Sequence, residues 1–145
     1  MSVGATIRKF AFVTMKQVIL AIRILSMLCL ACKKEPGQGG KASIQGDITV
    51  MDYDQTFKTL NGTYPGADRW VYIIYGDNVS YNDKVKTSFE GVYEFKYLNR
   101  GDYTIYTYSK DSTLQAPSGE VAVIKELEIT DKKQVVQVPE MIVFE

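Results

Sequence analysis

The sequence predicts an all-β protein, a sandwich of about seven short strands that follows an N-terminal signal segment. Three observations lead to this prediction. Short runs rich in β-branched and aromatic residues alternate with turn residues such as Gly, Asn, Asp and Pro. Several runs alternate between apolar and polar residues, which is the period of a half-buried strand. After the signal segment, no stretch of the 145-residue chain has the spacing of an amphipathic helix.

The alternation is clearest over residues 87–106. Because neighbouring residues of a strand point to opposite faces, it predicts an inward face of Tyr93, Phe95, Tyr97, Tyr103 and Ile105 and an outward face of Glu94, Lys96 and Thr104. Residues 99–101 interrupt the run, which predicts either a hairpin or a tight crossover between two sheets. We expect Gly101 to adopt a backbone conformation that a side chain would resist, because the chain reverses sharply there.

The other strands are predicted over residues 43–51, 69–75, 85–89, 121–129, 134–138 and 141–144. Val71 and Ile73 are expected to join the same core. Residues 52–68 are polar and contain two turn pairs, so they are predicted to form a long connection. Pro139 separates the last two strands, as is typical of a sheet edge.

A second pattern runs through this region: Glu90-Gly91, Tyr93-x-Phe95, Leu98, Gly101 and Tyr103-x-Ile105. Upstream, residues 42–46 and 65–74 supply a first strand and a Pro-Gly turn before a second strand. Over residues 41–110 the pattern resembles that of carboxypeptidase-regulatory-like domains, although Glu90 stands where that family usually has Asp. The resemblance implies an Ig-like or prealbumin-like (transthyretin-like) sandwich whose end Leu98 caps, and a mostly non-enzymatic, accessory role.

Residues 1–31 are predicted to be a lipoprotein signal peptide. Basic residues precede an apolar run, and the small residue Ala31 ends it. Met15 is an alternative start, because Met15-Lys16-Gln17 has the usual form of such a leader. Arg23 interrupts the apolar run, which disfavours a stable transmembrane helix.

Cys32 is the predicted site of lipidation. Residues 30–33, Leu-Ala-Cys-Lys, resemble the lipobox of bacterial lipoproteins, although Cys29 stands where Leu is usual. In that family the thiol receives a diacylglycerol, the leader is cleaved before the Cys, and the new amine is acylated. The resemblance implies that the membrane is a partner through this lipid anchor. Residues 32–41 would then be the lipidated Cys and a flexible linker, and residues 42–145 the sandwich.

Two other interpretations of this site stay open. Cys29 and Cys32 have the C-x-x-C spacing of redox and zinc sites. The pair ends a hydrophobic leader, however, and the chain has no other Cys and no His to complete a zinc site. The remaining interpretation is a plain signal peptide that is cleaved elsewhere.

Composition argues against several functions. The whole chain has 17 basic residues, 17 acidic residues and no His. Residues 33–145 carry 13 basic and 17 acidic residues, a net charge of −4, which disfavours nucleic acid as a partner. Without His the chain lacks the commonest general base near neutral pH and the commonest zinc ligand. We therefore expect no enzymatic activity, no cofactor and no bound metal.

Aromatic residues are the candidate ligand-binding residues, since the chain has ten tyrosines. The alternation predicts that four aromatic side chains face away from the core: Trp70, Tyr72, Tyr106 and Tyr108. An exposed aromatic row could stack on sugar rings or receive a partner protein. Alternatively, these rings cover the second face of a thin sandwich, because Tyr tolerates a partly wet position.

Calcium is a further alternative. Oxygen ligands could come from Asp52, Asp54, Asp77, Asn78, Asn82 and Asp83. These residues lack the spacing of an EF-hand, and turns favour Asp and Asn for their own backbone hydrogen bonds.

Taken together, these patterns lead us to expect a non-catalytic module of the bacterial cell envelope, lipid-anchored to the outer membrane, with a structural or protein-interaction role. The alternative is a carbohydrate-binding or calcium-binding module of a surface glycan-uptake or adhesion system. The expected partner is accordingly an envelope protein or a glycan. A shallow aromatic platform in the folded protein would favour the sugar binder.

Overall fold

Nine strands and no helix make up the part of the chain that the computed structural model describes, residues 35–145. The strands are β1 (Gln38–Tyr53), β2 (Leu60–Pro65), β3 (Trp70–Tyr75), β4 (Asp83–Lys86), β5 (Val92–Leu98), β6 (Gly101–Lys110), β7 (Glu120–Ile129), β8 (Val135–Gln137) and β9 (Met141–Phe144). The all-β class is confirmed, with nine strands instead of the expected seven. These residues contain no helix that is long and apolar enough to cross a membrane.

The first sheet is organised around β1. Along one edge, β1 pairs with β5 and then with β2, both antiparallel. Along its other edge it pairs with β8 and then with β9, both parallel. Pro139, which has no N–H to donate, lies in the break between β8 and β9. β1 therefore holds together segments from both ends of the described chain.

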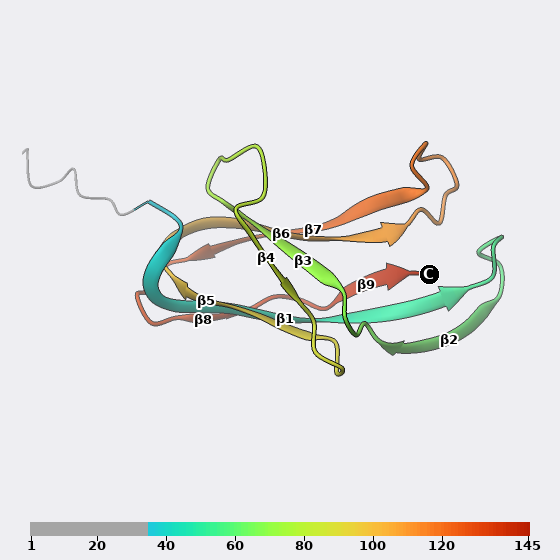
Figure 1. Ribbon diagram of the computed structural model, residues 1–145, viewed down its shortest axis with the longest axis horizontal. Coiled ribbons are helices and arrows are strands. Elements are labelled where there is room, and N and C mark those ends of the chain that lie inside the picture. The colour runs from blue at the N-terminus through green and yellow to red at the C-terminus, as the bar shows by residue number, and fades with distance from the viewer. Residues whose placement is uncertain (1–34) are drawn as a thin grey trace, which may run out of the picture. The chain divides into compact units, whose positions relative to one another are not determined.

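The second sheet has the strand order β4-β3-β6-β7, with all neighbours antiparallel. Figure 1 shows the two sheets as separate layers. Between them lies a single core of buried apolar residues: Ala42, Ile44, Ile48, Val50, Val71, Ile73, Tyr93, Phe95, Leu98, Tyr103, Ile105, Ile129, Val138, Met141 and Val143. This core contains six of the seven residues that the alternation placed inside, so residues 35–145 form a β-sandwich with a core of their own.

The chain crosses between the sheets at residues 99–100. β5 belongs to the first sheet and β6 to the second, so the predicted reversal is a crossover and not a hairpin. The buried Tyr103 hydroxyl accepts a hydrogen bond from Gly37 N (2.9 Å) and donates one to Asn99 O (2.8 Å). Gly101 has a φ of 137°, and a β-carbon there would lie 2.5 Å from Pro36 Cγ. The prediction for Gly101 is therefore confirmed.

Tyr97 was wrongly placed on the inward face. Its φ is +61°, its side chain is 70% exposed, and Leu98 fills the core position instead. The pairing of β1 with β5 shifts register at this end, from Ile44↔Phe95 to Ala42↔Leu98. Such an irregularity breaks the alternation, because one extra residue turns the following side chains to the opposite face.

Other boundaries also differ from the sequence-based expectation. β4 covers Asp83–Lys86, so the strand expected over residues 85–89 begins and ends earlier. β2 lies within residues 52–68, which were expected to be a connection without a strand. Its side chains are nearly all exposed, so it has no apolar alternation to reveal it. β1 begins at Gln38, so residues 38–41 belong to the sheet and not to the expected linker.

Candidate functional site

The outer face of the second sheet carries a row of aromatic side chains. Val71, Ile73 and Ile105 fill the inner face, so the alternate residues of β3 and β6 point outward. Cross-strand pairing aligns Lys84, Tyr72, Tyr106 and Ile124 across all four strands. All four aromatic residues predicted to face away from the core, Trp70, Tyr72, Tyr106 and Tyr108, are only partly buried and lie on these two strands.

The rings in this row pack on one another. Tyr72 and Tyr106 stack with ring centroids 5.0 Å apart and planes 13° apart, and Tyr108 meets Tyr106 edge-on at 5.7 Å. Burial raises the pKa of Tyr106, so its phenol stays neutral at physiological pH. Tyr72 and Tyr106 each cover one face of the other's ring, whereas the Trp70 side chain is 41% exposed and that of Tyr108 is 45% exposed. Trp70 and Tyr108 are therefore the most accessible of the four rings to a ligand.

Two lysines lie over Trp70. Lys84 Nζ is 4.3 Å from the ring centroid and Lys86 Nζ is 5.1 Å from it, which is cation–π geometry. Lys86 also forms an ion pair of 2.7 Å with Asp68, and both partners are largely exposed. An exposed pair of this kind contributes little to stability, so these side chains can move aside for a ligand.

A groove of about 410 Å³ opens at the end of this aromatic row. β3 begins at Trp70, whereas β6 continues to Lys110, so the sheet edge is stepped here. Three aromatic and four charged residues, together with Ala67 and Thr107, line the groove: Trp70, Tyr72, Tyr108, Asp68, Arg69, Glu120 and Glu145. The groove therefore combines exposed ring faces with hydrogen-bonding groups, as binding sites for small polar ligands do.

The charged wall of the groove is built by contacts between distant segments. Arg69 forms an ion pair with Glu145, and the Tyr64 hydroxyl donates a 2.6 Å hydrogen bond to Glu145 Oε2. The Arg69 side chain is 21% exposed and that of Glu145 is 40% exposed. Both side chains are thus held in place while keeping part of their polar surface free.

Two buried threonines fix the backbone on either side of Arg69. Thr87 Oγ1 accepts a hydrogen bond from Arg69 N (2.8 Å) and donates one to Gly66 O (2.5 Å). Thr107 Oγ1 donates to Trp70 O (2.9 Å). Both threonines are almost fully buried. This wall of the groove is consequently preorganised, which reduces the entropy that a ligand must overcome.

Sequence reasoning identified the aromatic side of this groove and missed its charged side. Trp70, Tyr72 and Tyr108 line the groove, whereas Tyr106 lies beside it against Tyr72. Arg69 had no local signal, and Glu120 and Glu145 come from other strands or their ends. Cys32, the predicted lipidation site, lies outside the described residues.

Two of the residues considered as calcium ligands, Asp54 and Asn82, accept hydrogen bonds within their own loops, whereas Asp52 and Asp83 lie in strands. Asp54 accepts hydrogen bonds from Lys58 N (2.8 Å) and Thr56 Oγ1 (2.8 Å), and Asn82 Oδ1 accepts one from Tyr75 N (2.8 Å). Over residues 35–145, no group of three or more acidic, His or Cys residues is arranged to hold a metal ion. The calcium alternative thus gains no support from this part of the chain.

Comparison with known proteins adds only distant likenesses. No family model matches the chain, and no curated protein matches its sequence. One similar solved structure is a Pseudomonas aeruginosa protein for which carbohydrate binding has been proposed (TM-score 0.43, 13% identity, covering 75% of this chain and 91% of that one). Another is (S)-allantoin synthase (TM-score 0.41, 12% identity, covering 73% of this chain and 42% of that one). A third is GBS52, the minor pilin of Streptococcus agalactiae (TM-score 0.38, 15% identity, covering 73% of this chain and 46% of that one). The chain thus spans less than half the length of the latter two, and at these TM-scores none of the three supports an argument about function.

Proposed function

We propose that this protein is a non-catalytic, lipid-anchored module of the bacterial cell envelope that binds carbohydrate in the groove beside Trp70. The observation that supports it is the groove itself, which is lined both by the exposed rings of Trp70 and Tyr108 and by the Arg69–Glu145 pair. Sugar rings present an apolar C–H face that packs on aromatic rings and hydroxyl groups that bond to charged side chains. The groove offers both kinds of contact within one site.

Titration calorimetry with a panel of soluble neutral oligosaccharides tests this assignment. We expect Trp70→Ala to weaken binding by about tenfold, which corresponds to ~1.4 kcal/mol. Tyr97→Ala is the matched control, because Tyr97 is another exposed aromatic residue but does not line the groove. Equal affinities for native protein and Trp70→Ala would contradict the proposal, and so would an equal loss in both variants.

A second candidate is a docking surface for an envelope protein, in line with an interaction role. Ile124 favours it, because this apolar side chain pairs with Tyr106 on the outer face and is 55% exposed. Ile124→Ser should weaken the binding of a protein partner and leave oligosaccharide binding unchanged, because Ile124 does not line the groove. The same variant therefore separates the two functions.

The lipid anchor at Cys32 is tested by metabolic labelling with a fatty acid. We expect Cys32→Ala to abolish labelling, to release the protein from membranes and to block removal of the leader. Several acyl chains hold a soluble domain firmly, because each buried methylene contributes ~0.8 kcal/mol. Label retained by the Cys32→Ala variant would contradict the anchor.

A further inference from the structure

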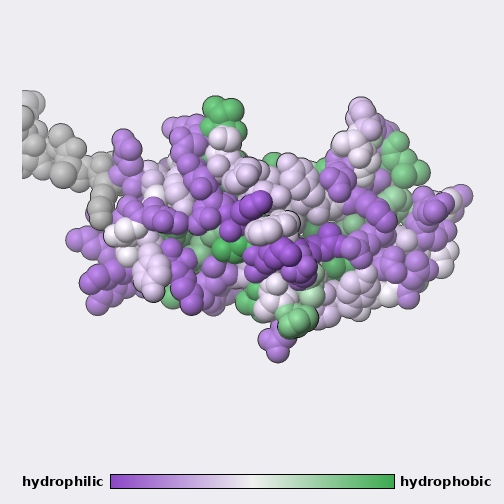
Figure 2. Space-filling model, in the orientation of Figure 1, coloured by the Kyte–Doolittle hydropathy of each residue, from purple (hydrophilic) through white to green (hydrophobic). Residues whose placement is uncertain are grey.

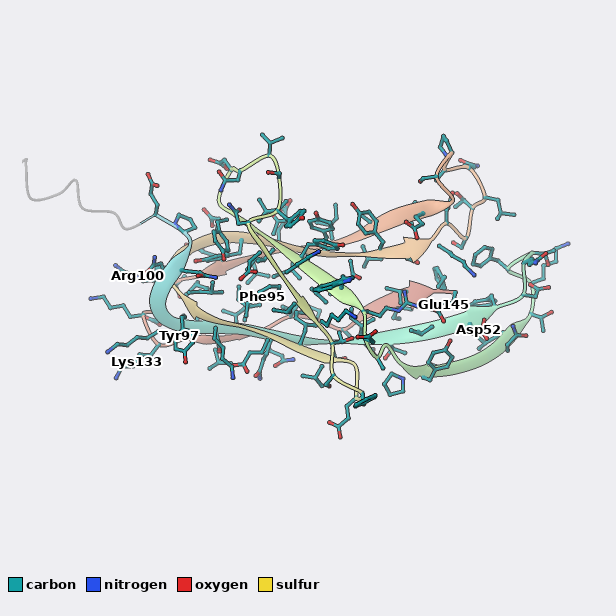
Figure 3. All side chains as sticks on the ribbon, viewed as in Figure 1. Asp52, Phe95, Tyr97, Arg100, Lys133 and Glu145 are labelled. Carbon is teal, nitrogen blue, oxygen red and sulfur yellow. The ribbon has the colours of Figure 1, made fainter. Side chains whose placement is uncertain are left out.

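A cavity of about 390 Å³ with four cationic side chains lies at the end of the domain where β1 begins. Its basic lining residues are Lys41 of β1, Arg100 of the crossover, and Lys132 and Lys133 of the turn between β7 and β8. The other lining residues are Gly39, Gly40, Leu98 and Asn99, so no acidic residue lines it. Figure 3 shows Arg100 and Lys133 at this end and Glu145, from the groove beside Trp70, at the opposite end.

These four cations are not neutralised by neighbours. Among residues 35–145, none of them has an ion pair within 4.0 Å, and all four residues are exposed. Glu35 and Asp131 lie nearby in sequence but do not line the cavity. Residues 33–145 carry a net charge of −4, so this end concentrates positive charge on an otherwise acidic domain. Figure 2 shows hydrophilic side chains over much of the visible face, with hydrophobic ones in separate patches.

The basic cavity is rigidly joined to the point where the chain enters the domain. Asn99 Nδ2 donates to Gln38 O (3.0 Å), and Asn99 N donates to Gly37 O (2.8 Å). Tyr103 also bonds Gly37 and Asn99, as described above. The start of β1 and the crossover that carries Arg100 therefore move as one unit.

An exposed aromatic side chain lies at the same end. Tyr97 is held in a left-handed conformation that a bulky residue rarely adopts, and its ring is 70% exposed. Figure 3 shows it at the same end of the domain as Arg100 and Lys133. Tyrosine suits a membrane–water boundary, because its ring is apolar and its hydroxyl is polar. The backbone irregularity thus presents to solvent a ring that the core does not use.

Covalent geometry limits how far this end can be from the lipid. Glu35 is three residues from Cys32, a span of at most about 11 Å. Lys33 and Lys34 add two more cations to that short segment. Glu35 O accepts a hydrogen bond from Asn99 Nδ2 (3.5 Å), and Asn99 lines the basic cavity, so a lipid attached at Cys32 would hold the near edge of the cavity within about 15 Å of the headgroups, where surface charge still acts at low salt.

We infer that the basic end, Lys41, Arg100, Lys132 and Lys133 with Tyr97, docks on the anionic phospholipid headgroups of the membrane that carries the anchor. The inference rests on lipidation of Cys32, which is part of the function proposed above. It assigns to the domain an end-on orientation, with the basic cavity against the headgroups and the groove beside Trp70 directed away from them.

Vesicle sedimentation at low salt tests the docking. The protein from Lys33 onward, which includes every described strand and the whole core, is mixed with phosphatidylcholine vesicles or with equal parts phosphatidylcholine and phosphatidylglycerol. We expect at least tenfold stronger binding to the anionic vesicles, lost on raising the salt. The triple variant Arg100→Gln, Lys132→Gln, Lys133→Gln should bind the anionic vesicles about tenfold more weakly or worse, since each cation near the surface contributes about fivefold to the affinity.

The matched control removes the same charge elsewhere: Lys58→Gln, Lys84→Gln, Lys110→Gln, none of which lines the basic cavity. It should change binding less than threefold. Equal losses in the two triple variants, or equal binding to both vesicle types, would overturn the docking surface. Release by inorganic phosphate beyond that caused by sodium chloride of equal ionic strength would also overturn it, and would indicate a site for free phosphate.

This experiment is independent of the anchor, because the protein tested lacks Cys32. If Cys32 is labelled by the fatty acid but the shortened protein does not bind anionic vesicles, the docking is refuted and the lipid anchor is retained. Binding of the shortened protein without labelling of Cys32 would refute the anchor and retain the basic end as a membrane-binding surface.

Discussion

Replacing Tyr93 by Phe should stabilise the domain, whereas the same change at Tyr103 should destabilise it. Both side chains are at most 2% exposed and lie in the same core. No donor or acceptor among residues 35–145 pairs with the Tyr93 hydroxyl, whereas the Tyr103 hydroxyl bonds Gly37 N and Asn99 O. Burial is the main cause that raises the pKa of both phenols, so both stay neutral at physiological pH.

The expected magnitudes follow from these partners. A buried polar group without a partner costs ~1–3 kcal/mol. The Tyr93 hydroxyl lies against Gly46, where an added β-carbon would be 2.5 Å from it. Tyr93→Phe removes the cost of the unpaired hydroxyl but leaves a small void beside Gly46, so we expect a gain in stability of about 1 kcal/mol. Tyr103→Phe removes two hydrogen bonds and leaves the Gly37 N–H buried without this acceptor, so we expect a loss of about 2 kcal/mol.

Urea denaturation followed by Trp70 fluorescence measures both free energies of unfolding. The two identical substitutions should differ by about 3 kcal/mol. In thermal melts they should separate by more than about 10 °C, since 1 kcal/mol shifts the midpoint by ~4–8 °C in a domain of this size. If Tyr93→Phe destabilises the domain as much as Tyr103→Phe, the Tyr93 hydroxyl has a hydrogen-bond partner and the reasoning fails.

Three further predictions concern the strand register, the crossover and the loop after β6. Phe95→Ala should lower the free energy of unfolding by ~3–5 kcal/mol through a core cavity, whereas Lys96→Ala, next to it and exposed, should change it by less than about 0.5 kcal/mol in the same urea melts. A larger loss for Lys96→Ala would mean that the register of β5 is wrong. Gly101→Val should cost ~1 kcal/mol or more because of the positive φ, and an unchanged melting temperature would argue against the crossover geometry. The pKa of Asp111 is lowered to about 2, mainly by the Thr113 hydroxyl and then by backbone N–H donors. A carboxylate whose pKa is lowered in the folded state stabilises the fold at pH values above its unfolded-state pKa, and this stabilisation is lost as the pH falls to the folded-state pKa. The stability difference between native protein and Asp111→Asn should therefore shrink between about pH 4 and pH 2, and a constant difference would contradict this prediction.

The core was predictable because it depends on local alternation. Phe95 and Ile105 each follow a period of two within one strand, and that period alone determines which face is buried. Tyr97 was not predictable, since a residue other than Gly with positive φ leaves no mark in the sequence. β2 was missed for a related reason, because it pairs with β1 through backbone hydrogen bonds while its side chains stay exposed.

The candidate groove was only half predictable, for a reason of topology. Trp70 and Tyr108 could be placed on an outer face from their own strands. Arg69 meets Glu145 only because β9 pairs with β1 in parallel, which brings the end of the described chain alongside its first strand. A contact between residues 76 positions apart depends on that pairing, and no local pattern in the sequence encodes it.

Charge segregation connects the groove to the basic end. The groove beside Trp70 carries three carboxylates, which Arg69 and the two lysines over Trp70 balance, whereas the end that holds Arg100 carries four cations and no acidic lining residue. On an anionic membrane the field attracts the basic end more strongly than the balanced charges around the groove. The proposed end-on orientation does not require a rigid attachment, because the charge distribution of the domain favours it. Salt should weaken this preference without releasing a lipid-anchored protein, since acyl chains are held by apolar burial and not by charge.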